Sequence, residues 1–84
     1  MDQASVKARI VEVIKENIIK NIDGVKKEDI DITKSMKDYG ANSLDIIEVV
    51  SCSMRELNLK VPRSELTDIK DIDELAEKFA QYQK

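Results

Sequence analysis

The sequence predicts an all-α protein, a small antiparallel helical bundle, and three observations support this. Apolar residues recur at helical spacing in three segments, the alternation typical of strands is missing, and the 84 residues include only one Pro and two Gly. A chain of this length can bury one core without disulfides or metals, so residues 1–84 are expected to form one domain. The economical arrangement is three main helices with a short helical turn and a long loop between the first two helices.

The first helix is expected from Ser5 to about Ile22, where aliphatic residues gather on one broad face. Gly24 can end this helix, because glycine readily adopts the backbone conformation that closes a helix. Residues 21–42 then form a long connection. Since a structureless loop of ~20 residues is unusual inside a compact domain, its apolar residues are expected to pin it across the helices. These residues are Val25, Ile30, Ile32, Met36 and Tyr39.

The second helix is expected from Ser43 to roughly Leu59. Pro62 marks its end, because a proline disfavours helical geometry at the residue before it. A short turn of helix is expected in residues 63–68, which read RSELTD.

The last helix opens at Asp71, whose side chain can cap it, and Glu74 can reach back as in a capping box. Its apolar residues share one stripe, which is expected to face the other two helices. The stripe comprises Ile72, Leu75, Ala76 and Phe79.

Composition argues against several classes of function. With no His and one cysteine, Cys52, the sequence offers no Ser-His or Cys-His pair, no internal disulfide and no zinc-finger spacing. Stand-alone catalysis is therefore disfavoured, no metal site is expected, and Cys52 is expected to pack at the edge of the core. The net charge is −3, with the acidic excess in residues 28–84, which repels nucleic acid and attracts basic protein partners. No apolar run approaches the ~20 residues that a membrane span needs, so a soluble cytoplasmic protein is expected.

The second helix displays an apolar residue on its outward side. A helical wheel places Leu44 nearly opposite the inward face, among polar residues, with Ile47 and Met54 at the border. An apolar strip rimmed by charges is typical of a transient docking surface, although isolated exposed leucines are also common, and for Met54 plain edge packing is equally open. The inward residues are Ile46, Val49, Val50, Ser53 and Leu57. The outward strip and its rim comprise Leu44, Asp45, Ile47, Glu48, Ser51, Met54, Arg55 and Glu56.

Ser43, at the start of this helix, has two interpretations. In the first, Asn42 or Ser43 simply caps the helix and Gly40 supplies a permissive turn. In the second, Asn42 caps the helix and Ser43 has a free hydroxyl at the first helical position, where the positive end of the helix favours an attached phosphate. No group nearby in the sequence can activate this serine as a nucleophile, so it would be modified by another enzyme.

The segment GANSLD, residues 40–45, resembles the Gly-x-Asp-Ser-Leu attachment motif of acyl carrier proteins. The likeness covers nearly the whole chain. It includes the order of the helices, the long first loop, the VP of residues 61–62 and the closing helix DIDELAEKFA, residues 71–80.

This resemblance implies that Ser43 receives 4′-phosphopantetheine from coenzyme A through a phosphodiester, placed there by a separate phosphopantetheinyl transferase. The thiol of the arm then holds acyl groups as thioesters, and a carrier of this kind, expected as a monomer without catalytic residues, presents them to acyltransferases, ketosynthases or HMG-synthase-like enzymes. The positions where the family meets its partners correspond to Leu44, Asp45, Ile47, Glu48 and Ser51. The inward positions that wall an acyl-chain cavity in some members correspond to Ile46, Val49, Val50 and Leu57.

Two departures from the family pattern point to a specialised carrier. Asn42 replaces the usual Asp before the serine, and Arg55 stands near the end of the second helix, where it would repel a basic docking patch. The region from residue 42 to residue 66 is similar to discrete carriers of polyketide β-branching cassettes, in which a donor carrier presents a short acyl group to an HMG-synthase-like enzyme. A peptidyl or D-alanyl carrier and an unmodified helical interaction module remain as alternatives.

Overall fold

A computed structural model describes residues 3–66 and 69–83, and confirms the all-α prediction. Within these residues three helices form, α1 (Gln3–Asn21), α2 (Ser43–Leu57) and α3 (Ile72–Tyr82), and no strand is present. Three short 3₁₀ helices lie between them: η1 (Lys27–Asp29), η2 (Met36–Tyr39) and η3 (Arg63–Leu66). Residues 67 and 68, at the end of the expected turn of helix, lie outside the described residues.

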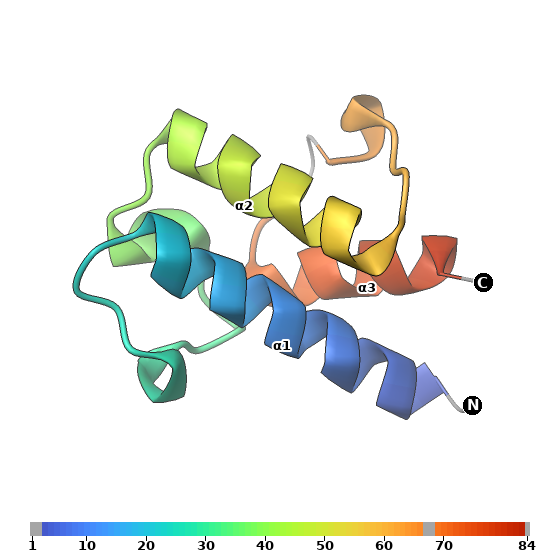
Figure 1. Cartoon of the computed structure of the whole chain (residues 1–84), viewed down its shortest axis with the longest axis horizontal. Coiled ribbons are helices and arrows are strands. Elements are labelled where there is room, and N and C mark those ends of the chain that lie inside the picture. Colours follow the sequence, from blue (N-terminus) through green and yellow to red (C-terminus); the bar gives the residue numbers. More distant parts are fainter. Residues whose placement is uncertain (1–2, 67–68, 84) are drawn as a thin grey trace.

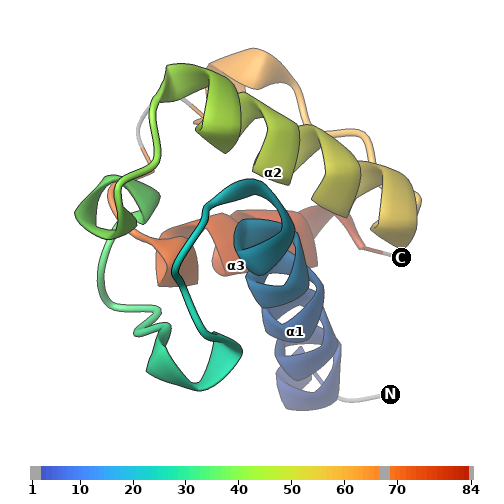
Figure 2. The same ribbon diagram turned by 60° about the vertical axis from the view of Figure 1, so that its left-hand side comes forward.

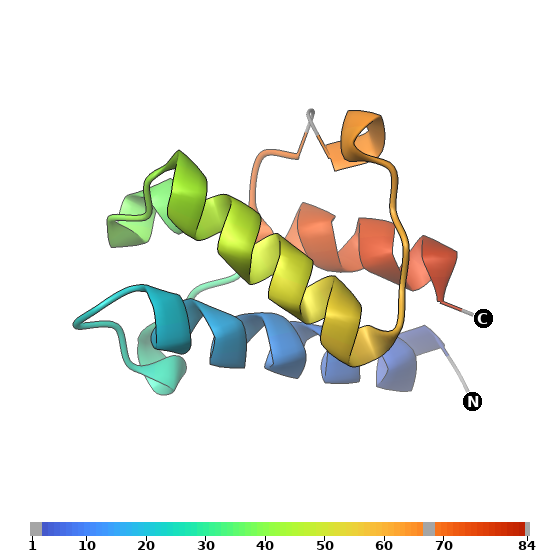
Figure 3. The same ribbon diagram turned by 45° about the horizontal axis from the view of Figure 1, so that its top comes forward.

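The three helices form a small bundle in which α2 and α3 run back against α1 (Figure 1). Figure 3 shows α2 crossing α1 obliquely, so the helices diverge toward one end of the bundle. Side chains of α1 and α3 fill the space between the helices, and the largest of them, Phe79, is completely buried. The buried residues of α1 and α3 are Ile10, Ile14, Asn17, Ile18, Ile72, Leu75, Ala76 and Phe79, so the predicted stripe of the last helix is confirmed.

The long connection between α1 and α2 is pinned as predicted, and the loop wraps the outer end of the bundle (Figure 2). Ile30 and Met36 are buried, while Val25, Ile32 and Tyr39 are half-buried against the core. Its backbone also accepts two hydrogen bonds from the first turn of α3, Ile72 N to Lys34 O at 3.1 Å and Asp73 N to Ile32 O at 2.8 Å. These two bonds hold the loop against α3 and thereby fix where α2 starts.

Charged side chains add ties at the surface. Lys7 Nζ lies 2.7 Å from both Asp73 Oδ1 and Glu77 Oε1, which joins α1 to α3. The hydrogen bond to Asp73, and after it the hydrogen bond to Glu77, raises the pKa of Lys7 above its ordinary value. Lys27 pairs with Glu12 and joins η1 to α1. Exposed pairs of this kind contribute little stability, so the apolar core determines the arrangement.

The C-terminal end of α2 differs from the prediction. The helix stops at Leu57 instead of Leu59, because Asn58 adopts a left-handed conformation with φ 55°. The backbone N–H groups of Asn58 and Leu59 then donate to the carbonyls of Arg55 and Met54, as in a Schellman-type cap. The helix therefore ends through Asn58, four residues before the Pro62 that was expected to end it.

The start of α3 is confirmed in one respect and corrected in another. Asp71 caps the helix, accepting a hydrogen bond from Glu74 N on Oδ1 at 2.8 Å. The Glu74 carboxylate does not complete a capping box with Asp71, since it accepts from Lys70 N at 2.9 Å, one residue further upstream. This contact fixes the chain just before the cap.

Candidate functional site

The start of α2 is held by a complete capping box centred on Asn42. Asn42 Oδ1 accepts from Asp45 N at 2.8 Å, and Asp45 Oδ2 accepts from Asn42 N at 3.1 Å. Just upstream, Gly40 has φ 89°, a left-handed conformation that favours glycine, and Ala41 is buried. The chain thus turns sharply before α2, and Asn42, not Ser43, caps the helix.

Ser43 is consequently the first residue of α2, and its side chain is exposed. Among the described residues nothing hydrogen-bonds to its hydroxyl. The backbone N–H groups at this end of a helix create a positive local potential, which favours a covalently attached phosphate. The neighbouring carboxylate of Asp45 is engaged in the capping box, so it is not placed as a base for Ser43. The serine is presented to solvent without any activating group.

The outward strip of α2 is exposed in part, and its apolar residues Leu44 and Ile47 are exposed as predicted. Leu44 is 73% exposed and Ile47 is 42% exposed, both high values for large apolar side chains. Glu48 and Arg55 are exposed beside them, whereas Asp45, Ser51 and Met54 are half-buried. Cys52 is also half-buried, with Sγ 4.0 Å from Glu48 Oε2, which agrees with its expected place at the edge of the core. The strip lies directly beside Ser43, so a protein docking there would meet the serine hydroxyl.

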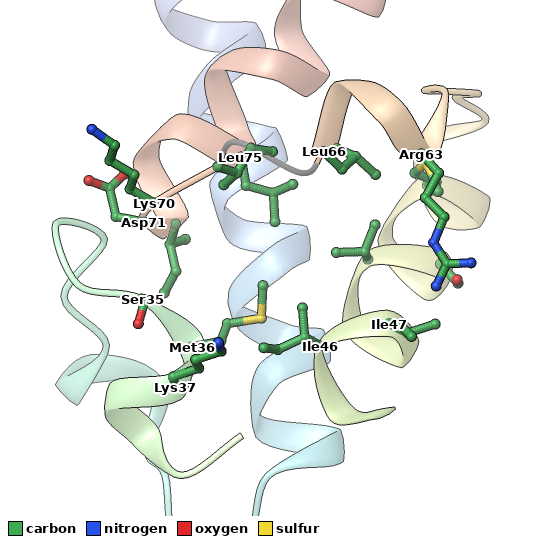
Figure 4. A pocket seen from close by; sticks show the side chains of 15 residues that line it. Ser35, Met36, Lys37, Ile46, Ile47, Arg63, Leu66, Lys70, Asp71 and Leu75 are labelled. Carbon is green, nitrogen blue, oxygen red and sulfur yellow. The ribbon is translucent and has the colours of Figure 1, made fainter. Parts of the chain in front are cut away.

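A cavity of about 550 Å³ opens beside the outward strip of α2, between this helix, η2, η3 and the first turn of α3 (Figure 4). Ile46 and Val50 form its α2 wall, as predicted, together with Ile47, Ser51 and Met54, which the sequence analysis had placed on the outward strip. The prediction was wrong for Val49 and Leu57, which are buried in the core instead of lining the cavity. The wall residues that sequence reasoning missed come from other segments: Met36, Leu66, Ile69, Ile72 and Leu75.

Comparison with known proteins identifies the family. Residues 16–79 match the family model described as a phosphopantetheine attachment site. The chain is also 39% identical over 74 residues to the polyketide biosynthesis acyl-carrier-protein AcpK of Bacillus subtilis (strain 168), covering 84% of this chain and 87% of that protein. The chain belongs to the acyl carrier protein family.

Acyl carrier proteins bear a covalent 4′-phosphopantetheine on a serine and are not themselves catalytic, so this protein acts as a carrier and interacts with the enzymes that modify and use it. When bound, the arm supplies a thiol that holds acyl groups as thioesters. The start of α2 fits such a group, because an exposed serine hydroxyl stands at the positive end of a well-capped helix. Elsewhere among the described residues, no cluster of three or more His, Cys, Asp or Glu could hold a metal ion. No helix in the same residues is long and apolar enough to cross a membrane.

Proposed function

We propose that Ser43 is the residue that carries the phosphopantetheine arm, and that the protein serves as a discrete acyl carrier in polyketide biosynthesis. The observation that carries this proposal is the capping box: because Asn42 satisfies the helix terminus, the Ser43 hydroxyl is left exposed and unused. The assignment to polyketide biosynthesis rests on the similarity to the Bacillus subtilis carrier.

Modification of Ser43 requires a transferase, since no group in the described part of the chain is placed as a base for it. In the proposed step, Ser43 Oγ attacks the phosphorus of coenzyme A that bears the pantetheine. The phosphoanhydride bond breaks, adenosine 3′,5′-bisphosphate leaves, and the hydroxyl proton passes to a base of the transferase. The product is a phosphodiester at the amino end of α2, where the helix stabilises its negative charge. The protein itself performs no catalysis in this proposal.

The partner surface in this proposal is the outward strip of α2. Leu44 and Ile47 would enter an apolar depression of the partner, and Glu48 and Arg55 would orient it. Asp45, Ser51 and Met54 complete this surface, and Met54 also lines the cavity. Its partners would be the phosphopantetheinyl transferase and acyltransferase, ketosynthase or HMG-synthase-like enzymes, with the carrier acting as a monomeric single domain of residues 1–84.

Intact-mass measurement tests the attachment site. The protein is incubated with coenzyme A and a phosphopantetheinyl transferase of broad specificity, and we expect the wild type to gain one arm and Ser43→Ala to gain none. Ser5→Ala, which removes the hydroxyl of an exposed residue of α1, away from the outward strip of α2, is the matched control and should be modified like the wild type. An arm on Ser43→Ala, or an unmodified wild type with several competent transferases, would refute the proposal.

A loading assay separates acyl carriers from peptidyl or D-alanyl carriers. The holo protein is offered acetyl, malonyl and aminoacyl groups by their respective loading enzymes, and thioester formation is followed by mass. Loading with acyl groups supports the proposal, whereas exclusive loading with an amino acid would assign the protein to the peptidyl or D-alanyl class.

A further inference from the structure

We infer that the cavity beside α2 accommodates acyl chains ending in a carboxylate, and that Lys37, Arg63 and Lys70 attract that carboxylate. The inference rests on the proposed function, because the chain would be tethered through the arm on Ser43. It goes further in naming the class of cargo and the residues that select it.

The position of Ser43 gives a tethered chain direct access to the cavity. Residues three, four, seven and eleven places after Ser43 lie on the same face of a helix. In α2 these are Ile46, Ile47, Val50 and Met54, all of which line the cavity. A chain attached at Ser43 therefore reaches the cavity along one face of α2, without crossing the exposed Leu44.

The interior of the cavity suits methylene groups. Figure 4 shows Met36 and Ile46 directed toward a common space, with Leu66 and Leu75 on the opposite side. Burial of apolar chain against such side chains is favourable because it removes both surfaces from water. An alkyl segment between the arm and the end group would therefore be held by these four residues.

The charges around the cavity distinguish between end groups. The lining includes three cations, Lys37, Arg63 and Lys70, and one carboxylate, Asp71. Asp71 Oδ1 is committed to the cap of α3. The three cations come from separate segments, η2, η3 and the residues before α3, and all three line one cavity in a chain whose net charge is −3.

None of these three cations has an ion-pair partner in the part of the chain that the structure describes. Lys7, Lys20, Lys27 and Lys78 pair with carboxylates, whereas exposed cations away from the cavity, such as Arg9, Lys26 and Lys60, are unpaired like these three within the described residues. A carboxylate beside an apolar wall would interact with the unpaired cations more strongly than it would in bulk water. An uncharged chain of equal length would gain nothing from them.

A matched pair of acyl chains tests the inference. Adipoyl and hexanoyl groups have the same number of carbons and differ in the terminal carboxylate. Each is loaded with its arm onto Ser43 from the corresponding acyl-coenzyme A by a broad-specificity transferase, and intact mass confirms loading. In adipoyl protein labelled with ¹³C at the terminal carboxyl, we expect the pKa of this carboxyl to lie at least about 0.3 unit below that of free adipoyl-pantetheine, because nearby cations favour the charged form.

A triple variant identifies the cations responsible. In K37Q/R63Q/K70Q, the pKa of the terminal carboxyl should return to that of free adipoyl-pantetheine. The amide chemical shifts of Leu66 and Leu75 in this variant should then be similar for the adipoyl and hexanoyl proteins. R9Q/K26Q/K60Q is the matched control, because it removes one Arg and two Lys that are exposed and lie away from the cavity. In this control variant, most of the difference between the pKa of the terminal carboxyl and that of free adipoyl-pantetheine should remain.

Other results would overturn the inference in distinguishable ways. An equal pKa in wild type and K37Q/R63Q/K70Q would show that these residues do not attract the carboxylate. Equal amide shifts of Leu66 and Leu75 in holo and adipoyl protein would show that the acyl chain does not enter the cavity. A wild type that gains no mass would refute the proposed function itself, and an acyl-loaded protein without discrimination would refute only this inference.

Discussion

The two inward-facing sides of α2 are packed very differently. Toward α1, Val49 and Ser53 are completely buried, and Asn17 Nδ2 donates to Ser53 Oγ at 3.2 Å across the two helices. Toward η3 and the start of α3, Ile46 and Val50 are only half-buried and face the cavity. One helix is thus fixed firmly by one face while another face borders free space. This suits a carrier, because α2 must hold Ser43 in place without filling the volume beside it.

Phe79→Ala tests the closely packed core between the helices and should have the largest effect on stability. Phe79 is completely buried among the aliphatic residues of the core, so truncation leaves a cavity that the helices cannot readily fill. We expect a loss of about 3 to 5 kcal/mol in the free energy of unfolding, measured by urea denaturation followed by circular dichroism.

Leu66→Ala is the control at the cavity beside α2. Leu66 is half-buried and borders the cavity, so less apolar contact is lost, and we expect a cost of about 1 kcal/mol. If the two variants were equally destabilised, the contrast between the two sides of α2 would be wrong.

Substitution of Asn42, whose cap positions Ser43, should have a modest effect on the free energy of unfolding. Asn42→Ala removes the acceptor for Asp45 N, and we expect a loss of about 1 kcal/mol, measured by thermal or urea unfolding. Asn42→Asp, which restores the usual residue of the family motif, should leave stability nearly unchanged because Asp caps helices about as well as Asn. A large loss in Asn42→Asp would show that the amide makes a contact beyond the cap.

Much of the fold could be predicted because it depends on local patterns. The apolar stripe of α3 and the cap at Asp71 follow from spacing and residue type within one helix, and both are confirmed. The end of α2 was misplaced because Pro62 is a stronger sequence signal than Asn58, whose left-handed conformation is visible only in the structure.

The site was predictable only in the part formed by one helix. A wheel placed Leu44 outward correctly, but it could not separate residues that face α1, such as Val49, from residues that face the cavity, such as Val50. That separation depends on where η3 and the long loop lie, and the loop is held by backbone bonds from Ile72 and Asp73. Such long-range contacts leave no periodic signal in the sequence, and this is why Met36 and Leu66 were missed as cavity walls.

Leu44→Asp should have the smallest effect on stability and separates docking from folding. Leu44 is 73% exposed and lies outside the core, so we expect the free energy of unfolding to change by no more than about 0.5 kcal/mol. The same substitution places a charge in the apolar strip, and binding to a partner that covers this strip should weaken. The relevant measurement is the rate of arm transfer to Ser43 at limiting carrier concentration, compared with urea unfolding of the same variant.

Lys60→Asp is a suitable control for this comparison, because Lys60 is exposed and lies beyond the end of α2. It changes the net charge by two units, against one for Leu44→Asp, so a general electrostatic effect would slow arm transfer at least as much in this variant. A selective loss in Leu44→Asp would locate docking on the outward strip beside Ser43. If Leu44→Asp instead lost several kcal/mol of stability, as a core truncation does, the Leu44 side chain would have to pack inward. The assignment of Leu44 to the outward strip of α2 would then be wrong.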